Sequence, residues 1–374
     1  MTTSGKNVGH ESKPRRSCAI MIATAVEKKP MYLRNCWYVA GWSRELDNES
    51  GLLARTILDE PIVLCRMSDG RLAAFADRCP HRRLPLSAGT VTKDGLRCGY
   101  HGLEFDHAGV CIRVPGQESI PPKAHVRCYP VVEKWRWIWI WMGEPDQADE
   151  ALIPDYHWND DPDWLSIGDR FHVMGGYRLL VDNLLDLSHV QFVHGSTLGT
   201  ETVVDFPLEI RREADAVHVD RWILDGPPPP MFEKAGNVTG NVDRWQLITW
   251  TAPSHVVIDV GCAPAGCGAQ DGKRDGGIEM YSNHTITPET AGSCHYFWHH
   301  ARNFRLDEPE VTEFLGNAAS SAFYEDVIII DAQQKSIDAM PTAVTRIDIN
   351  ADSGVLQASR ILDRRIAEEA ATPP

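Results

Sequence analysis

The segments Cys79-Pro80-His81 and Cys98-Gly99-Tyr100-His101 are two Cys/His pairs separated by sixteen residues. Such a set matches a [2Fe–2S] centre in which two thiolates hold one iron and two imidazoles hold the other. We therefore expect Cys79 and Cys98 on one iron, and His81 and His101 on the other. Because neutral imidazoles replace two thiolates, the reduction potential rises to roughly −150 to +300 mV, which suits a centre that accepts electrons. The spacing predicts a cluster held by two tight loops.

The sequence around these pairs predicts a compact all-β unit. Short strand-like segments at 55–58, 62–66 and 72–76 are followed by turns rich in Gly, Pro and Asp. Four tryptophans then alternate with other residues from Trp135 to Trp141, which places their indoles on one face of a strand. We expect these rings to pack between two domains. The acidic stretch 146–163 ends the pattern and is predicted to lead into a second domain.

A second group of candidate metal ligands follows the acidic stretch. Asn183, Asp186 and His189 are spaced three residues apart, so a helix over 182–194 would carry them on one side. His194 lies five residues after His189, and a distorted last turn ending at Gly195 would have to bring it back. Two imidazoles and one carboxylate on one face of an iron leave positions open for O₂ and substrate. The pattern predicts a mononuclear Fe(II) site.

The third ligand has to come from another segment. A helix expected over 311–337 carries Glu325, Asp326 and Asp331, and the isoleucine run beside them leaves its buried face ambiguous. A buried carboxylate needs a partner, and a metal ion would provide one. From the residues alone, all three acids remain candidates. The tail from 351 onward is polar and is expected to be peripheral.

Composition excludes several classes of protein. The chain has 374 residues, 43% of them hydrophobic, and no apolar run reaches the ~18 residues that a membrane span needs. Its formal net charge of −15 would repel a nucleic acid. The ten cysteines are scattered, which favours a reducing cytoplasm over a disulfide scaffold. Residues 1–30 are expected to form a disordered extension, although Arg15 and Arg16 loosely imitate an export signal.

Residues 31 to about 340 resemble the α subunit of Rieske non-haem iron oxygenases, and within them the vanillate and dicamba O-demethylase branch. The resemblance depends on the sequences Asn35 to Ala40, Cys79 to Arg82, Cys98 to Gly102, Asn183 to Gly195, Thr287 to Thr290 and His295 to Trp298. It implies that Asp326 is the iron-binding acid, because this residue occupies the Asp position of the family's F-x-E-D segment.

The resemblance also implies the fold and the assembly. We expect an α+β protein with an N-terminal all-β Rieske [2Fe–2S] domain over 31–145 and a catalytic domain over 146–374. The catalytic domain should have a helix-grip, START-like antiparallel sheet, and the subunits should form a head-to-tail homotrimer. Electrons would pass from His101 of one subunit to Asp186 and its hydrogen-bonded His189 in a neighbour. Asp186 and Asn183 are thus the expected catalytic residues beside the ligands.

The function implied is that of a terminal oxygenase. A flavin and [2Fe–2S] reductase, or a ferredoxin with its reductase, would deliver electrons for O- or N-dealkylation of a small aromatic compound with O₂. Ring hydroxylation by the same iron and electron carriage alone are the alternatives. His284 occupies the position at which these demethylases contact a polar substrate group, although a core histidine would fit equally well. Asn317 stands where dicamba-like enzymes have Trp, which would leave room for a bulkier or more polar substrate.

Overall fold

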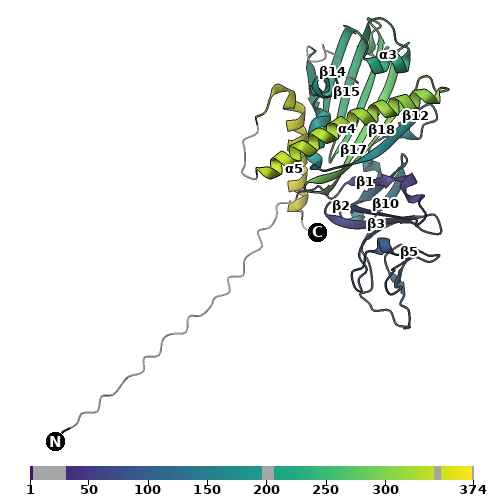
Figure 1. The fold of residues 1–374 in the computed structure, drawn as a ribbon, viewed down its shortest axis with the longest axis vertical. Helices are drawn as coiled ribbons and strands as arrows, with labels where there is room; N and C mark the ends of the chain where they lie inside the picture. Colours follow the sequence, from purple (N-terminus) through teal and green to yellow (C-terminus); the bar gives the residue numbers. More distant parts are fainter. Residues whose placement is uncertain (3–30, 196–205, 341–346, 373–374) are drawn as a thin grey trace.

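The computed structural model describes residues 1–2, 31–195, 206–340 and 347–372. Its strands form two groups, an N-terminal group of small sheets and one large C-terminal sheet crossed by a long helix (Figure 1). The extension predicted to be disordered falls almost entirely on residues 3–30, which lie outside the described part. None of the described helices has both the length and the apolar character needed to cross a bilayer.

The N-terminal group consists of one three-stranded and two four-stranded antiparallel sheets, in the orders β1-β11-β10, β2-β3-β4-β9 and β5-β6-β7-β8. Its strands are β1 (Trp37–Trp42), β2 (Leu52–Ile57), β3 (Glu60–Arg66), β4 (Leu72–Ala76), β5 (Thr90–Val91), β6 (Leu96–Arg97), β7 (Glu104–Phe105), β8 (Cys111–Arg113), β9 (Cys128–Tyr129), β10 (Val131–Lys134) and β11 (Trp137–Trp141). The prediction of an all-β N-terminal domain is confirmed.

The C-terminal group is a seven-stranded antiparallel sheet in the order β12-β18-β17-β16-β15-β14-β13. Its strands are β12 (Leu165–Val173), β13 (Leu208–Arg212), β14 (Ala216–Gly226), β15 (Val242–Thr251), β16 (His255–Pro264), β17 (Ile278–Thr290) and β18 (Ser293–Arg302). The helices are α1 (Tyr177–Leu185), α2 (Val190–Val193), α3 (Pro230–Gly236), α4 (Pro309–Ala339) and α5 (Ser353–Ala371). Figure 1 shows α4 lying obliquely along the sheet, so the predicted α+β class is confirmed.

The two groups of strands share an extensive apolar seam. The indoles of Trp137 and Trp139 pack in one cluster with Phe297 of β18, as the alternation in the sequence predicted. Polar bonds fix the relative position of the two groups, because the Thr287 hydroxyl donates to the Val39 carbonyl at 2.6 Å. The predicted division at 145/146 falls between β11 and β12, where the chain leaves one group of sheets for the other.

Helix α5 contradicts the expectation of a peripheral tail. Val355, Ala358, Ile361, Leu362 and Ile366 are buried in the largest apolar cluster of the protein. These residues recur at intervals of three and four, which is the helical period, and they lie against β14. The polar composition of the segment hid an amphipathic helix, because only one face of it is apolar.

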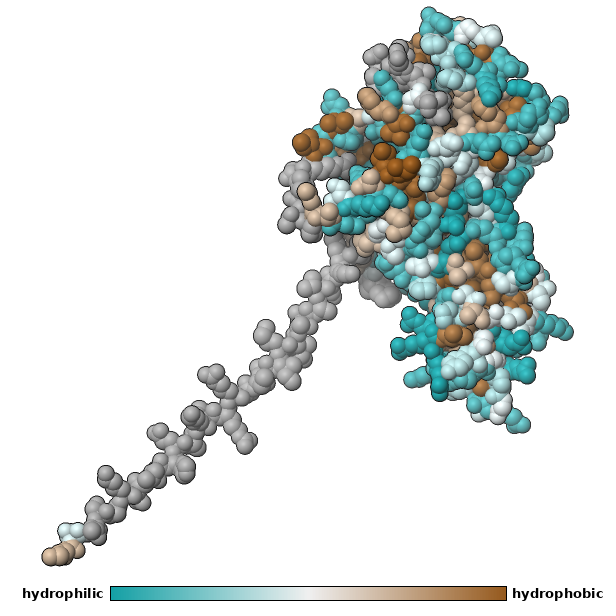
Figure 2. Space-filling view, in the orientation of Figure 1, coloured by the Kyte–Doolittle hydropathy of each residue, from teal (hydrophilic) through white to brown (hydrophobic). Residues whose placement is uncertain are grey.

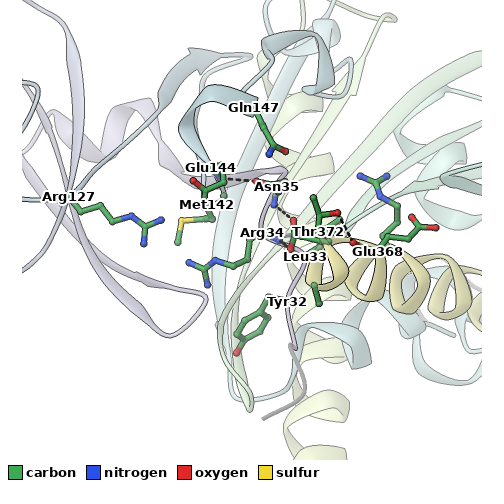
Figure 3. Close-up of a pocket in the computed structure, with 14 residues that line it drawn as sticks. Tyr32, Leu33, Arg34, Asn35, Arg127, Met142, Glu144, Gln147, Glu368 and Thr372 are labelled. Carbon is green, nitrogen blue, oxygen red and sulfur yellow. Dashed lines mark hydrogen bonds between the residues drawn. The ribbon is translucent and has the colours of Figure 1, made fainter. Parts of the chain in front are cut away.

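The end of α5 also contacts the chain just before β1. Both carboxylate oxygens of Glu369 accept backbone N–H groups, from Arg34 at 2.8 Å and Asn35 at 2.6 Å. These residues border a hollow at the surface between α5 and the N-terminal strands (Figure 3). The Asn35 side chain in turn accepts the amide of Glu144 at 2.8 Å. The polar groups around the hollow therefore bond to one another, and the hollow lies apart from the candidate metal ligands.

The bonds of Glu369 to the backbone before β1 predict an effect on stability. Replacing Glu369 by alanine should lower the free energy of unfolding by about 1–3 kcal/mol, because two amide donors lose a charged acceptor. Glu368 is the matched control, since its side chain is exposed on the same helix and, within the described part of the chain, its ion pair is with Arg364 of α5 and not with the N-terminal strands. Urea unfolding of both variants would measure the difference. Equal stability of the two variants would contradict the role assigned to Glu369.

Candidate metal centres

The two Cys/His pairs lie on loops with the same backbone geometry. The amide of each cysteine donates to the carbonyl five residues later, at 2.9 Å for Cys79 and 2.8 Å for Cys98. Each cysteine carbonyl accepts from the amide four residues later, Arg83 at 2.9 Å and Gly102 at 3.1 Å. Both of these residues have positive φ, 62° for Arg83 and 72° for Gly102, which closes each loop tightly. The structure therefore presents the two pairs in equivalent ways.

The loops bring the four candidate cluster ligands together in two layers. Cys79 and Cys98 are buried, and their thiols hydrogen-bond each other. His81 and His101 are exposed, with ring centroids 4.4 Å apart. Burial raises the pKa of the Cys79 thiol to about 11, while backbone N–H groups of His81 and Arg82 act to lower it. Amide donors aimed at a buried sulfur suit a cluster thiolate, since hydrogen bonds to sulfur tune such centres.

The second motif differs from the single helix expected over 182–194. Helix α1 ends at Leu185 with Asp186 as its C-cap, and α2 is one short turn from Val190 to Val193. His189 and His194 flank α2 as its N-cap and C-cap. The predicted distortion exists, but it lies at Asp186 to His189 rather than in the last turn. Because the helix is interrupted between α1 and α2, both imidazoles can point toward one site.

His189, His194 and Asp326 converge at one point. The Nε2 atoms of the two histidines are 3.3 Å apart, and Asp326 Oδ1 lies 3.1 Å from His194 Nε2 and 3.5 Å from His189 Nε2. Asp326 and His194 are buried, and His189 is half-buried. Such separations are those of neighbouring donor atoms around one first-row metal ion. The three side chains thus form a group suited to Fe(II) with open coordination positions.

The outer nitrogen of each histidine is also occupied. Nδ1 of His194 bonds the Glu325 carboxylate at 2.7 Å, and Nδ1 of His189 bonds the backbone carbonyl of Asp186. An acceptor at Nδ1 fixes the proton there and leaves the Nε2 lone pair for a metal. Glu325, which the sequence left as an alternative to Asp326, therefore bonds the outer ring nitrogen of a candidate ligand. Asp331, the other rival, accepts the amide of Met174 at 2.9 Å.

Electrostatics supports a cation at this point. Burial lowers the pKa of His189, which keeps its imidazole neutral. Burial also acts to lower the pKa of His194, but Asp326 and Glu325 outweigh it and raise that pKa. Two imidazole lone pairs and a carboxylate facing each other in a buried site repel unless a positive charge lies between them. The donor set therefore fits the iron that the sequence predicted.

Asp186 and Asn183 lie beside this group, in a different arrangement from the expected one. The side-chain amide of Asn183 donates to Asp326 Oδ1 at 3.2 Å. The carboxylate of Asp186 accepts the amide of Ser188 at 2.8 Å and also its hydroxyl, while only its backbone carbonyl reaches His189. Within the chain, therefore, Asp186 orients His189 through the main chain and not through its carboxylate.

The candidate iron site opens on a cavity of about 90 Å³ between the helices and the sheet. Its apolar lining includes Leu184, Leu187, Val190, Met231, Phe232, Ile258, Val260 and Phe323. Among the described residues, its polar lining apart from the three candidate ligands consists of Arg244, Gln246, Ser282 and His300. A mostly apolar cavity with a few polar groups is typical of a site for a small organic molecule.

Two residues expected near the substrate are absent from the lining of this cavity, and a substrate contact by His284 stays a prediction. His284 is fully buried and is not among the residues that line the cavity, and its ring nitrogens bond Ser282 and Tyr296, both at 2.8 Å. Its contacts are those of the core histidine that the sequence left as the alternative. Asn317 is exposed on α4 and does not line the cavity either, so it gives no information about substrate size.

Sequence reasoning missed Arg244 and His300, which do line the cavity. Only the alternation of β15 and β18 could have indicated them, and that alternation is obscured because both faces of these strands are largely buried. Burial lowers the pKa of His300 to about 4, so its imidazole is neutral. Burial also lowers the pKa of Arg244 to about 10, which leaves its guanidinium charged at neutral pH.

Comparison with known proteins agrees with this geometry. Residues 36–130 match the Rieske [2Fe–2S] domain, and residues 173–368 match the vanillate O-demethylase oxygenase C-terminal domain. The chain is 40% identical to the iron-sulfur subunit of a toluene-4-sulfonate monooxygenase system from Comamonas testosteroni, over 92% of this chain and 100% of the relative. It is 38% identical to a vanillate O-demethylase oxygenase subunit from a Pseudomonas strain, over 91% and 96% of the two chains.

A solved structure of dicamba monooxygenase bound to 3,6-dichlorosalicylic acid superposes with a TM-score of 0.85 at 35% identity, covering 91% of this chain and 99% of that one. The identities extend through both groups of sheets, so they cover the cluster loops and the cavity together. The chain therefore belongs to the Rieske non-haem iron oxygenases of the vanillate and dicamba O-demethylase type, and it is an oxidoreductase with a [2Fe–2S] cluster and a mononuclear iron.

Proposed function

We propose that this chain is a terminal oxygenase that dealkylates a small aromatic compound at oxygen or nitrogen. The observation that carries the proposal is the convergence of His189, His194 and Asp326 at the wall of a mostly apolar cavity. In this assignment these three residues hold the mononuclear iron. Cys79 with Cys98, and His81 with His101, hold the two irons of the cluster.

The protein residues around the iron would position the iron ligands and exclude water, and they would not react themselves. When bound, the mononuclear iron supplies the activation of O₂. Glu325 and the Asp186 carbonyl orient the two imidazoles, and Asn183 holds the Asp326 carboxylate. The apolar walls keep water from the reacting carbon, which limits side reactions. Hydroxylation of a carbon attached to oxygen or nitrogen gives a hemiacetal or carbinolamine, which then loses an aldehyde.

Electron delivery is proposed to occur between subunits of a homotrimer. The sheet β5 to β8 that carries the cluster loops lies at one end of the molecule, and α3 with the far end of the large sheet lies at the other (Figure 1). His101 is exposed on those loops, so a neighbouring subunit can approach it. At this contact between subunits, the electron would pass through Asp186 to His189. A cytoplasmic reductase, alone or with a ferredoxin, would reduce the cluster.

The names of the relatives give different compounds to act on, which include toluene-4-sulfonate, vanillate, dicamba and a chloroacetanilide. An iron site shared by such enzymes leaves the choice of bond to the pocket. Dealkylation is proposed because several of these names specify an O-demethylase and one an N-alkylformylase.

The test is the product. With a generic reductase and a panel of methoxylated and N-alkylated aromatics, each coupled turnover is expected to release one aldehyde per NADH and O₂ consumed. Trapped aldehyde is measured beside O₂ uptake, with uncoupled peroxide as the control. A cis-dihydrodiol, or a ring phenol without aldehyde, would instead assign ring hydroxylation. Electron transfer without oxidation of any compound in the panel would favour an electron carrier.

A further inference from the structure

We propose that Arg221 is a positioning residue, which fixes the chain between α1 and α2 and thereby the orientation of the His189 imidazole. The inference rests on the proposed function, because it takes His189 to be a ligand of the mononuclear iron. It adds a residue of the large sheet that is not among the described residues lining the cavity.

Arg221 is a charged residue on an apolar face of the sheet. Successive side chains of a strand point to opposite faces, so Arg221 shares one face of β14 with Val217 and Val219. Both valines are buried in the largest apolar cluster, and Arg221 itself is 3% exposed. A buried cation is costly unless other groups bond to it. The partners of Arg221 therefore indicate what the residue does.

The guanidinium is bonded to the segment between the two short helices. Nη1 of Arg221 donates to the backbone carbonyl of Leu187 at 3.0 Å. In the part of the chain that the structure describes, this carbonyl is the hydrogen-bond acceptor of the side chain, and Nε has none. Leu187 belongs to the segment 186–188, which lies between α1 and the N-cap of α2. Because this segment lies outside both helices, a bond from the sheet fixes its position relative to the strands.

The same segment also holds the imidazole of His189. The backbone carbonyl of Asp186 bonds Nδ1 of His189, and the next carbonyl, of Leu187, accepts from Arg221. Peptide units are planar and rigid, so these two carbonyls are related by the two backbone dihedral angles of Leu187. When Arg221 fixes one carbonyl, it restricts the direction of the other and therefore the orientation of the imidazole.

The charge of Arg221 acts on the same segment. Burial lowers the pKa of Arg221, and the negative charge of Asp186 opposes this shift. A guanidinium stays charged in proteins, so its attraction to Asp186 stabilises the start of the segment beside β14. The segment is thus held by a charge-assisted hydrogen bond and by attraction between opposite charges.

A histidine that binds a metal depends on the group bonded to its other ring nitrogen. Removing such a partner typically lowers metal affinity or activity by about 10- to 100-fold. For His189 this partner is a backbone carbonyl, which a side-chain substitution cannot remove. Arg221 is the side chain through which the position of that carbonyl can be changed.

The experiment compares variants of the full-length holoenzyme. Arg221→Met removes the donor and the charge, and it is expected to weaken binding of the mononuclear iron about 10-fold or more, measured by competition with a chelator. The EPR signal of the reduced cluster should not change. Arg221→Lys keeps the charge and a donor, so it should recover part of the affinity.

The second measurement is a spectroscopic signature of the iron ligands. Nitric oxide added to the Fe(II) protein gives a high-spin EPR signal whose line shape depends on how the ligands are arranged. The line shape should change in Arg221→Met and return toward that of wild type in Arg221→Lys. A loss of stability alone would not alter the line shape of the protein that remains folded.

Arg211→Met is the matched control, since Arg211 lies on the neighbouring strand β13 and pairs with Asp220 at the surface at 3.0 Å. It should leave iron affinity and line shape unchanged. Wild-type affinity and line shape in Arg221→Met, or equal changes in Arg211→Met, would overturn the proposal. If Arg221→Met does not fold, Arg221→Gln replaces it with the same expected results, because its neutral amide is shorter than the guanidinium.

Asp326→Ala, measured in the same series, separates this inference from the proposed function. Iron lost from Asp326→Ala with an unchanged line shape in Arg221→Met would keep the proposed ligands and reject the role of Arg221. Iron retained in Asp326→Ala with a changed line shape in Arg221→Met would keep the role of Arg221 and reject that ligand set. Iron lost from the first variant and a changed line shape in the second is the result that supports both.

Discussion

Replacing Asp326 by alanine is expected to remove the mononuclear iron and to leave the [2Fe–2S] cluster in place, so that iron falls from about three to about two per chain. Turnover should be lost, while the visible and EPR signals of the reduced cluster remain. The reason is the position of the carboxylate, whose Oδ1 lies 3.1 and 3.5 Å from the two candidate imidazole ligands. Without it, two imidazoles would face a buried site without a compensating negative charge.

Glu313→Ala is the control for this variant, because Glu313 is exposed on the same helix α4. It should retain iron and turnover. Iron analysis, EPR and O₂ uptake measured on both variants separate the two centres. Loss of the cluster signal from Asp326→Ala, or three irons retained, would show that the ligand assignment is wrong. A folded Asp326→Ala protein is confirmed by its far-UV circular dichroism.

The second large effect is expected from Asp186→Asn, which should keep both metals and lower turnover by about 100-fold or more. Asparagine can still accept the Ser188 amide, and the backbone carbonyl that orients His189 is unchanged. What disappears is the negative charge on the proposed path between subunits. The decisive measurement is a single turnover from prereduced cluster, in which cluster reoxidation with substrate and O₂ should slow by the same factor.

Ser188→Ala is the control, since it removes one hydroxyl bond to the Asp186 carboxylate and leaves its charge. It is expected to reduce turnover only slightly. Near-normal turnover of Asp186→Asn would reject the role of the carboxylate in electron passage. Loss of mononuclear iron from Asp186→Asn would instead assign the residue to iron binding.

Much of the fold and of the site could be predicted because metal ligands come in short, spaced motifs. Cys79 to His101 predicted a cluster domain, and the structure brings those side chains together. The helix expected over 311–337 is α4, Pro309–Ala339. The choice of Asp326 over Glu325, however, came from resemblance, because a helix flanked by several isoleucines does not reveal its buried face.

The rest depended on contacts between distant segments. The polar composition of α5 hid its apolar stripe, and the break after Asp186 depends on local capping that the 3.6-residue period does not anticipate. Arg244 and His300 become cavity residues only when strands β15 and β18 are placed in one sheet. His284 and Asn317, which the resemblance placed near the substrate, are not among the residues that line the cavity, so a substrate contact by His284 stays a prediction.

The contact between Glu369 and the backbone of Arg34 and Asn35 joins residues 335 and 334 positions apart. During synthesis, the cluster domain leaves the ribosome long before α5 does, so the strand at its edge forms without its final partner. Tyr32 and Leu33, which are buried in the finished protein, would stay accessible to chaperones and proteases until α5 arrives. Cluster insertion into the nascent chain would therefore have to tolerate an incompletely docked N-terminal segment.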